Sequence, residues 1–420
     1  MSLFPVGHAS HADWRNAAER VLLQLREQLL RQPQARHRLG LVYVSKSMAR
    51  HAQELLALLA RSLPQVTDWV GSSGDAVLAM EHEYSAEMAV AVMLLDIPAA
   101  HYRIYSGVAP LALGGTEAGF EAHSALVHAD VDQPELAELL LELSERTSSG
   151  NLFGAVGGEH SVQFACREED LARLRSGGSV GVFQGGFSGV AFDSDVACIS
   201  RLAQGCTPLG QGLEITETRG PVLLELDGEP ALPRLLELLD VQAGPHAGGG
   251  WQAALSQLRK TQAAIAPLGR GLERGVLSDE AQVLHIVGLD PVRQGIALSS
   301  GVESEHTVIF CQRQASAARH ELLQMGAALK DALLADFVDA EPGVEPEPAP
   351  LHIRGAVYMS CKGRGSELFG GPDAELRLLR HALGPVPLIG VMAEAQLMDA
   401  RVHQLAGVLT VFTGPSTTGV

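Results

Sequence analysis

The sequence lacks the features that mark secreted, membrane-spanning and disulfide-stabilised proteins. Its N-terminal residues contain no basic stretch followed by an apolar core, and no run of about 18 uncharged apolar residues occurs. The five cysteines are odd in number and widely spaced, with no CxxC motif, so neither a disulfide framework nor a structural zinc site is expected. We therefore predict a cytoplasmic protein that inserts into no membrane.

Aromatic side chains and positive charge are also scarce. Phe, Trp and Tyr make up 5% of the chain, which argues against stacking platforms for single-stranded nucleic acid. The 31 Lys and Arg residues against 49 Asp and Glu give a net charge of −18, which repels a phosphate backbone on average. We expect no nucleic-acid partner. The 420 residues, 46% of them hydrophobic, can form large cores in two or three domains.

Common catalytic signatures are missing as well. The chain contains no GxSxG elbow, no GxxxxGK[ST] phosphate loop, no HExxH motif and no GxGxxG after a strand. The 16 histidines are scattered, and the densest acid–histidine cluster, residues 81–83, is expected on a solvated turn. No metal ligand set stands out from the sequence.

Hydrophobic periodicity predicts helices and strands in alternation. Helices are expected over residues 13–30, 52–63, 134–143, 230–239 and 374–383. Strands are expected over residues 41–44, 66–70, 89–95, 152–156, 180–183, 190–192, 196–200, 222–226, 356–360, 386–391 and 408–412. Residues 242–250 are expected to form a loop and the Pro- and Glu-rich residues 341–350 a linker. The predicted fold class is mixed α/β, of the α+β type.

Two segments of the chain are similar to each other. Gly40–Ser45 and Gly355–Ser360 share Gly, Val, Tyr and Ser in the same order. Each is followed by a helix and by a strand with a glycine and, four residues later, an acid: Gly71 and Asp75, then Gly390 and Glu394. A looser third copy runs from Gly154 to Glu159. We predict two sheet-containing lobes with covering helices, related by internal duplication.

The three glycine-plus-acid segments are predicted turns with two interpretations. Glycine lets a ligand approach the backbone closely, and the acid can then hold an ammonium or hydroxyl group. Alternatively, glycine forms the turn and the acid is solvated or caps the next element. The first interpretation makes ligand-binding candidates of Gly71, Ser72, Ser73, Asp75, Glu159 and Glu394.

Two cysteines add further candidates. Cys361 lies beside Lys362 and Arg364, cations that would favour its thiolate, and Arg364 could bind a carboxylate or phosphate through its planar fork. Cys206 lies where a strand is expected to break into a turn. No histidine partner can be recognised for either thiol, so packing as buried small residues is the alternative to nucleophilic catalysis.

Several motifs together resemble the FIST sensory domain family. They are Val70–Gly74, with serine where the family usually has cysteine, Gln204–Gly210, Leu224–Leu232, Ser360–Gly365 and Leu383–Gly390. The segment Leu368–Gly370 also fits, whereas Ala393-Glu394-Ala395 keeps only the carboxylate of the usual Gly-Glu-Ile. The resemblance covers nearly the whole chain. It implies a FIST N-like domain over residues 1–225, with its core at 38–220, and a FIST C-like domain over residues 226–420.

The resemblance implies a sensory module that binds small ligands such as amino acids and acts through a separate signalling protein, for example a histidine kinase. Three hypotheses follow. The first is a non-catalytic small-ligand sensor without a cofactor. The second is a haem-based nitric-oxide sensor that regulates a histidine kinase or a cyclic-dinucleotide enzyme. The third is an enzyme with a cysteine nucleophile. The residues expected to bind the ligand are Gly71, Ser72, Ser73, Asp75, Glu159, Cys206, Cys361, Arg364 and Glu394.

Overall fold

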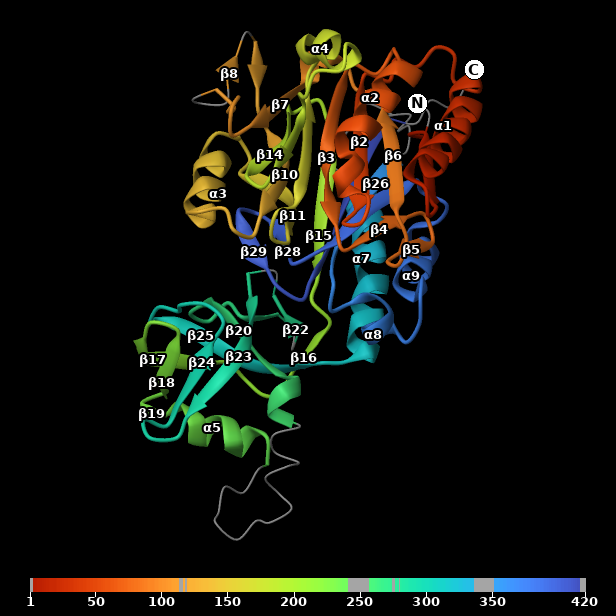
Figure 1. The fold of residues 1–420 in the computed structure, drawn as a ribbon. Coiled ribbons are helices and arrows are strands. Elements are labelled where there is room, and N and C mark those ends of the chain that lie inside the picture. The colour runs from red at the N-terminus through yellow and green to blue at the C-terminus, as the bar shows by residue number, and fades with distance from the viewer. Residues whose placement is uncertain are drawn as a thin grey trace, which may run out of the picture. The chain divides into compact units, whose positions relative to one another are not determined.

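The computed structural model describes residues 3–112, 116–117, 119–240, 257–273, 276–278, 280–335 and 351–415 (Figure 1). These residues form two compact units, one within residues 1–203 and 322–420 and the other within Gln204–Glu321. The units do not coincide with the two consecutive domains expected from the sequence, whose boundary stays a prediction. The expected loop 242–250 and linker 341–350 lie outside the described residues.

The first unit contains three six-stranded sheets. Sheet A has the strand order β1 (Val6–Ser10), β6 (Ala89–Leu95), β2 (Leu39–Ser45), β3 (Asp68–Gly74), β12 (Val162–Cys166) and β13 (Val182–Gln184). Sheet B has the order β15 (Cys198–Ala203), β30 (Gly407–Pro415), β26 (Leu351–Cys361), β27 (Leu388–Ala393), β4 (Ala76–Ala79) and β5 (His82–Tyr84). Sheet C has the order β29 (Arg401–His403), β28 (Ala395–Met398), β11 (Asn151–Gly157), β10 (Ser124–Asp130), β14 (Phe187–Phe192) and β7 (Tyr102–Ser106).

Each sheet has one parallel strand pair at its centre, with a helical connection between the two strands. The pairs are β2–β3 in sheet A, β10–β11 in sheet C and β26–β27 in sheet B. Their connections contain α2 (Ala52–Ser62), α3 (Leu136–Glu145), and α8 (Gly365–Phe369) with α9 (Ala374–Leu383), respectively. Parallel neighbours need such a crossover because the chain must return to the starting edge of the sheet.

The strand after each parallel pair leaves its own sheet and joins the next one. After β3, β4 pairs with β27 of sheet B; after β27, β28 pairs with β11 of sheet C; after β11, β12 pairs with β3 of sheet A. The three exchanges form a closed cycle, from sheet A to sheet B, from B to C and from C back to A. We call the three groups repeat 1 (β2 to β4), repeat 2 (β10 to β12) and repeat 3 (β26 to β28). The internal similarity seen in the sequence is therefore a threefold structural repeat within the first unit.

One glycine occupies the same position in all three repeats. A Cβ atom on Gly71, Gly154 or Gly390 would lie 1.8, 1.9 or 1.7 Å from the carbonyl oxygen of the neighbouring parallel strand. Only a residue without a side chain fits there. The prediction that Gly71–Asp75 forms a turn was wrong, because Gly71–Gly74 completes the buried strand β3 and the chain changes sheet after it.

The alignment of the two similar sequence segments differs by one residue from the alignment of the structural repeats. Gly71 pairs with Val42 and Gly390 pairs with Tyr358, so Val42 and not Tyr43 is equivalent to Tyr358. Tyr43 points into the core shared by the three sheets, where its hydroxyl lies 3.1 Å from His128 Nε2. Tyr358 points to the opposite, helix-covered face of its sheet and donates to Glu375 of α9.

The core of the first unit lies between the inner faces of the three sheets, where apolar residues of all three gather. Two helices cover the outer face of sheet A: α1 (Trp14–Leu30), which Asp13 caps, and α2, which buries residues at helical spacing (Figure 1). The short α4 (Leu171–Arg175) joins them, and α3 covers sheet C. Sheets covered on both faces explain why β2, β3 and β6 are buried throughout.

The second unit is built on a closed ring of antiparallel strands. In order around the ring these are β17 (Leu213–Arg219), β18 (Val222–Leu226), β24 (Gly295–Leu298), β23 (Gln282–Asp290), β20 (Thr261–Pro267) and β25 (His306–Arg313). Strand β16 (Cys206–Pro208) pairs with β25, and β19 (Glu229–Pro230) pairs with β18. The helix α5 (Ala231–Leu238) packs its apolar side into the core of this barrel.

The remaining elements connect these parts. The long α7 (Ala315–Ala335) runs from the second unit into the first, where Gly326 lies against Ala382 of α9. Short elements are the hairpins β8 (Thr116–Glu117) with β9 (Phe120–Glu121) and β21 (Leu272–Glu273) with β22 (Val276–Leu277), and the 3₁₀ turns Ala49–His51, Ala99–His101 and Glu168–Asp170. The mixed α+β class is confirmed. Among the described helices, none is long and apolar enough to cross a membrane.

Candidate functional site

The three parallel strand pairs end together at one side of the first unit. The backbone N–H of Asp75, after β3, donates to the carbonyl oxygen of Met392 on β27 at 2.9 Å, and that of Glu394, after β27, donates to Val156 on β11 at 3.0 Å. Val162 on β12 donates its N–H to Ser73 Oγ on β3 at 2.9 Å. The carboxyl ends of parallel strands, where connecting loops diverge, are a common place for ligand sites in α/β proteins.

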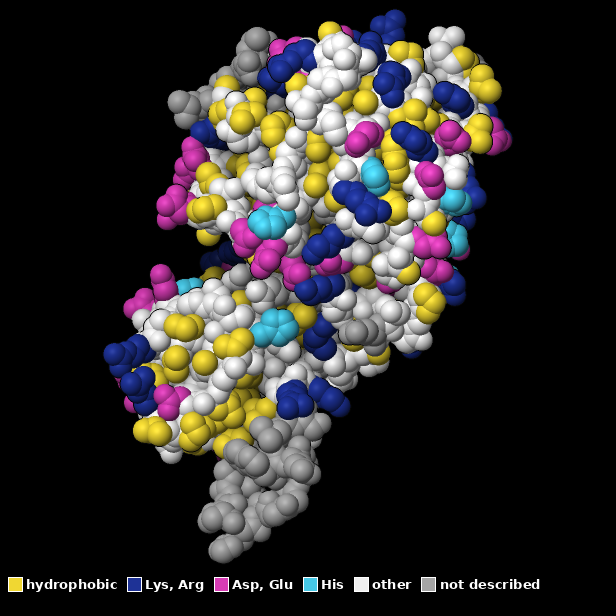
Figure 2. All heavy atoms as spheres, in the orientation of Figure 1, with side chains coloured by type: hydrophobic (Ala, Val, Ile, Leu, Met, Phe, Trp, Pro, Cys, Tyr) yellow, Lys and Arg dark blue, Asp and Glu magenta, His cyan; other side chains and the backbone are white. Residues whose placement is uncertain are grey.

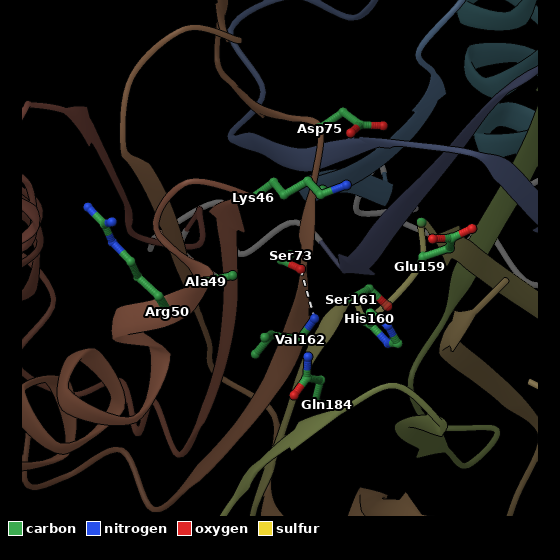
Figure 3. A pocket seen from close by; sticks show the side chains of 12 residues that line it. Lys46, Ala49, Arg50, Ser73, Asp75, Glu159, His160, Ser161, Val162 and Gln184 are labelled. Carbon is green, nitrogen blue, oxygen red and sulfur yellow. Dashed lines mark hydrogen bonds between the residues drawn. The ribbon is translucent and has the colours of Figure 1, made fainter. Parts of the chain in front are cut away.

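A hollow of about 520 Å³ opens at this side (Figure 3). Three of the residues predicted from the sequence line it, namely Ser73, Asp75 and Glu159. The structure adds Lys46 at the end of β2, His160 and Ser161 beside Glu159, and Gln184 of β13. In Figure 3 the Lys46 side chain extends into the space between Asp75 and Glu159, whereas Arg50 points away from it. The hollow thus has one ammonium group and two carboxylates around it.

Repeat 3 contains the equivalents of Lys46 and Asp75. Lys46 donates its N–H to the carbonyl oxygen of Gly74, and Lys362 donates in the same way to Ala393. In repeat 3 the ammonium group of Lys362 bonds to the carboxylate of Glu394, and this hydrogen bond, with Asp75 also nearby, raises the pKa of Lys362. In repeat 1, neither Lys46 nor Asp75 forms an ion pair or side-chain hydrogen bond with another described residue. Both remain open towards the hollow.

Repeat 2 differs from the others by an insertion. The repeated glycines define the equivalent residues, because Gly390 pairs with Leu78, Gly154 with Leu397 and Gly71 with Phe164. The residue three positions before each of these partners is therefore equivalent in the three repeats. These residues are Asp75, Glu394 and Ser161. The sequence suggested that Glu159 is the third copy of the repeated acid, but the strand register shows that Ser161 occupies that position. Glu159 belongs to three extra residues, Gly158–His160, that line the hollow, with His160 at a φ of 58°. Ser161 itself donates to Asp130 through both its N–H and its hydroxyl.

Glu394 and Cys361 lie next to the hollow. A Cβ atom on Gly158 would come within 3.6 Å of a Glu394 carboxylate oxygen, so Glu394 borders the insertion. The Cys361 thiol is only 4% exposed and lies 3.9 Å from the Glu394 carbonyl oxygen. Gly71 and Ser72 are buried within β3 and precede Ser73 and Gly74 at the end of that strand.

Arg364 is held away from the hollow. Its guanidinium is fully buried, pairs with Glu375 at 2.7 Å, donates to the carbonyl oxygen of Ala203 and lies over the Phe369 ring. Glu375 also accepts hydrogen bonds from Tyr358 and Ser360, which hold the carboxylate of this buried ion pair in place. Arg364 does not line this hollow, because its guanidinium is buried and bonds to Glu375 and to Ala203 instead.

Cys206 belongs to the second unit. Its thiol is 2% exposed and forms a hydrogen bond with the Cys311 thiol, which raises the pKa of Cys311 together with burial. Burial also raises the pKa of Cys166 to about 12 and of Cys198 to about 11. The thiols of Cys311, Cys166 and Cys198 are therefore kept protonated, as expected for buried cysteines that contribute to packing.

Sequence reasoning missed Lys46, His160 and Gln184. A signal for Lys46 was present, because a lysine follows the first strand of both similar segments, at Lys46 and Lys362. No comparable signal existed for Gln184, which β13 carries to the hollow only through its pairing with β12.

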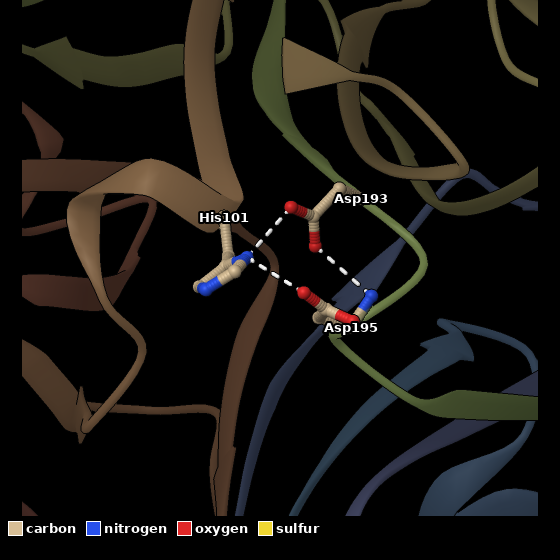
Figure 4. Close-up of side chains that lie close together, drawn as sticks. All are labelled: His101, Asp193 and Asp195. Atoms are coloured by element: carbon tan, nitrogen blue, oxygen red, sulfur yellow. Dashed lines mark hydrogen bonds and ion pairs between the residues drawn. The ribbon is translucent and has the colours of Figure 1, made fainter. Parts of the chain in front are cut away.

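One further group of side chains has the composition of a metal site. His101 Nδ1 lies 2.7 Å from Asp193 Oδ2 and 3.4 Å from Asp195 Oδ2, and the three ligand atoms lie within 4.8 Å of one another (Figure 4). Asp195 also donates its N–H to Asp193, which shapes the turn after β14. The hydrogen bond between the imidazole and Asp193 accounts for this arrangement, and we assign no metal to it.

Charges of both signs are interspersed on the face of the molecule that Figure 2 shows. On the face that Figure 2 shows, Lys and Arg side chains lie among Asp and Glu side chains rather than in one basic patch. A single-sign cationic patch is the usual footprint of a nucleic-acid binding protein, and this face does not have one.

Comparison with known proteins identifies the class of this fold. The FIST N domain matches residues 38–229 and the FIST C domain matches residues 231–397. The chain therefore belongs to the FIST family, whose domains are sensory domains of signal transduction. The hollow lies in the unit that contains most of the FIST N match and the end of the FIST C match.

Its relatives include proteins of mycobacteria. The uncharacterized protein MT0656 of Mycobacterium tuberculosis is 27% identical over 412 residues, which cover 95% of each chain. The uncharacterized protein Mb0898c of Mycobacterium bovis is 25% identical over 412 residues, which cover 93% of each chain. An acetylornithine aminotransferase of Lactiplantibacillus plantarum is 25% identical over 280 residues, covering 62% of this chain and 67% of that protein.

Proposed function

We propose that this protein is a non-catalytic cytoplasmic sensor that binds a small amino-acid-like metabolite in the hollow and acts through a separate signalling partner, such as a histidine kinase. The observation that carries the proposal is the open Lys46–Asp75 pair at the joined carboxyl ends of the strands. Membership of a family of sensory domains supports the same conclusion.

The chemistry of the hollow suits a ligand with groups of both charges. An ammonium group recognises a carboxylate, and a carboxylate recognises an ammonium group, by charge-assisted hydrogen bonds. In repeat 3 the side chains of Lys362 and Glu394 satisfy each other. In repeat 1, where Lys46 and Asp75 form no such ion pair, the α-carboxylate of a zwitterion would pair with Lys46 and its α-ammonium group would pair with Asp75.

A sensor must bind its ligand with different affinities in two conformations. Lys46 and Asp75 belong to repeat 1, whereas Glu159 and His160 belong to repeat 2. A ligand that contacts all of them would tighten the junction between two repeats. The proposed signal is this change at the junction, which a partner protein would read.

The hollow does not fit a haem. A porphyrin is bound between largely apolar walls and needs an axial ligand. His160 could serve as an axial ligand, but Lys46, Asp75, Glu159 and Gln184 supply polar and charged walls around it. The hypothesis of a haem-based nitric-oxide sensor therefore has no support from this hollow.

Thermal unfolding of the purified full-length chain with a library of amino acids and small metabolites tests the proposal. We expect at least one zwitterionic compound to raise the melting temperature, because a ligand that binds only the folded state stabilises it. The variants Lys46→Met and Asp75→Asn should abolish the shift. Lys330→Met, which removes an exposed lysine on α7, should leave it unchanged. A library without any stabilising compound would contradict the proposal.

A further inference from the structure

We propose that the insertion Gly158–His160 is the recognition loop of the hollow and that Glu159 selects amino acids with a second cationic group, as in basic side chains. This inference rests on the proposed function and specifies its ligand class. It follows from the comparison of the three repeats and from the charges that surround the hollow.

The insertion is not needed to join one sheet to the next. In repeat 1 the chain passes from Gly74 at the end of β3 through Asp75 directly into β4, and in repeat 3 it passes from Ala393 through Glu394 into β28. Both connections cross between sheets without extra residues. In repeat 2, three additional residues separate Gly157 from Ser161, the equivalent of Asp75 and Glu394.

The insertion also turns the chain through a left-handed backbone conformation at His160. Its φ of 58° lies in the left-handed region, which a few per cent of residues other than Gly adopt, with Asn, Asp and His enriched among them. All three inserted residues line the hollow, so the conformation directs the loop to that place.

Charge balance then defines the ligand. Lys46 contributes one positive charge to the hollow, while Asp75 and Glu159 each contribute a negative charge. Arg50 also borders the hollow, but its Nε donates to His51 and its side chain points away in Figure 3. A zwitterion that pairs with Lys46 and Asp75 leaves the charge of Glu159 unbalanced. A cationic side chain on the ligand would balance it.

The neighbouring acid does not compete for this role. Glu394 borders Gly158, but its carboxylate is bonded to Lys362. Glu159, by contrast, forms no ion pair or side-chain hydrogen bond with another described residue and is exposed to solvent. It is therefore available to a ligand, and the attraction between Glu159 and a cation is moderated by water.

Calorimetric titration of the full-length protein with L-lysine and L-norleucine tests the inference, because the two differ chiefly in the terminal ammonium group. We expect lysine to bind about fivefold more tightly, as a partly solvated ion pair allows. Glu159→Gln should remove this difference and leave norleucine binding unchanged. Glu138→Gln, on the exposed side of α3, removes the same charge elsewhere and should preserve the difference.

A second variant deletes residues 158–160 and joins Gly157 to Ser161, as Gly74 joins Asp75. We expect it to fold, as the two shorter connections do, and to lose the preference for lysine. If lysine remains preferred after Glu159→Gln, the inference is wrong. If wild-type protein binds norleucine and lysine equally, the inference fails while the proposed function stands. If it binds no amino acid or metabolite at all, the proposed function fails with it.

Discussion

The backbone N–H of Asp75 donates to the carbonyl oxygen of Met392, 2.9 Å away, and so ties the end of β3 to β27 of another sheet. Glu394 makes the equivalent bond to Val156, which ties β27 to β11. The residues that surround the hollow are thus placed by backbone hydrogen bonds between repeats. A site built in this way depends on the closure of the three repeats rather than on any one loop.

The repeated glycines should be intolerant of substitution. In Gly390→Ala, the new methyl group would lie 1.7 Å from the Tyr358 carbonyl oxygen, so β26 and β27 must move apart. We expect a loss of about 3 kcal/mol or more in the free energy of unfolding, at the upper end for overpacked sites. Chemical denaturation followed by circular dichroism measures it.

Gly107→Ala is the matched control, because no atom lies within 4 Å of the added methyl group. It should change the free energy of unfolding by less than about 0.5 kcal/mol. Equal stability of Gly390→Ala and Gly107→Ala would show that the close strand approach in repeat 3 is wrong.

The buried ion pair of Arg364 and Glu375 should be a structural element of repeat 3. Arg364→Met would leave the Glu375 carboxylate buried without its cation, at a cost of about 3–5 kcal/mol. The double variant Arg364→Met/Glu375→Leu should recover part of this loss, because no charge is left unpaired. Urea denaturation of the three proteins measures both effects.

Arg31→Met is the control for this prediction. It breaks an exposed ion pair with Glu27 on α1 and should cost less than about 1 kcal/mol. If Arg364→Met were as mild as Arg31→Met but abolished amino-acid binding, Arg364 would be a ligand-binding residue after all.

Individual helices and strands could be predicted from the sequence where their hydrophobic residues follow a regular pattern. The amphipathic periods gave α9 at Ala374–Leu383 and β18 at Val222–Leu226 with the observed bounds, and α1 within a residue. The segment Gly71–Gly74 was mistaken for a turn, because glycine and serine are poor strand formers in isolation. Its place in β3 depends on the close approach of β2, which is a tertiary relationship.

The candidate site was predictable only in part for the same reason. Ser73, Asp75 and Glu159 reach one hollow because three strands change sheets, and no local pattern encodes that exchange. Arg364 and Lys362 looked alike beside Cys361, yet one is fully buried and the other is 55% exposed. The difference depends on α9, which brings Glu375 under β26.

Both candidate nucleophiles should react slowly in the folded protein. Cys361 and Cys206 are 4% and 2% exposed, so a thiol reagent cannot reach them without local opening. We expect dithionitrobenzoate at neutral pH to label them far more slowly than free cysteine, and all five cysteines to react in denaturant. Rapid labelling of Cys361, located by peptide mass spectrometry, would instead support the cysteine-enzyme hypothesis.

Buried histidines should make the protein less stable in mild acid. Burial lowers the pKa of His8 and His403 to about 4 and that of His128 to about 3. In the unfolded chain the pKa of histidine is about 6.5, so between pH 6.5 and 4 the unfolded state binds more protons than the folded state. Each such histidine should then lower the free energy of unfolding by about 1.4 kcal/mol per pH unit as the pH falls, with no effect above pH 7.

His403→Gln isolates one of these contributions, since glutamine binds no proton in either state. Urea denaturation at several pH values between 7 and 4.5 measures the free energy of unfolding. This free energy should decline less steeply with falling pH for this variant than for the wild type, and the difference in slope should correspond to close to one bound proton. His352→Gln, at an exposed position of β26, should follow the wild-type slope. Parallel slopes for wild type and His403→Gln would mean that His403 can be protonated in the folded protein, and hence that water or an anion reaches the inner end of β29.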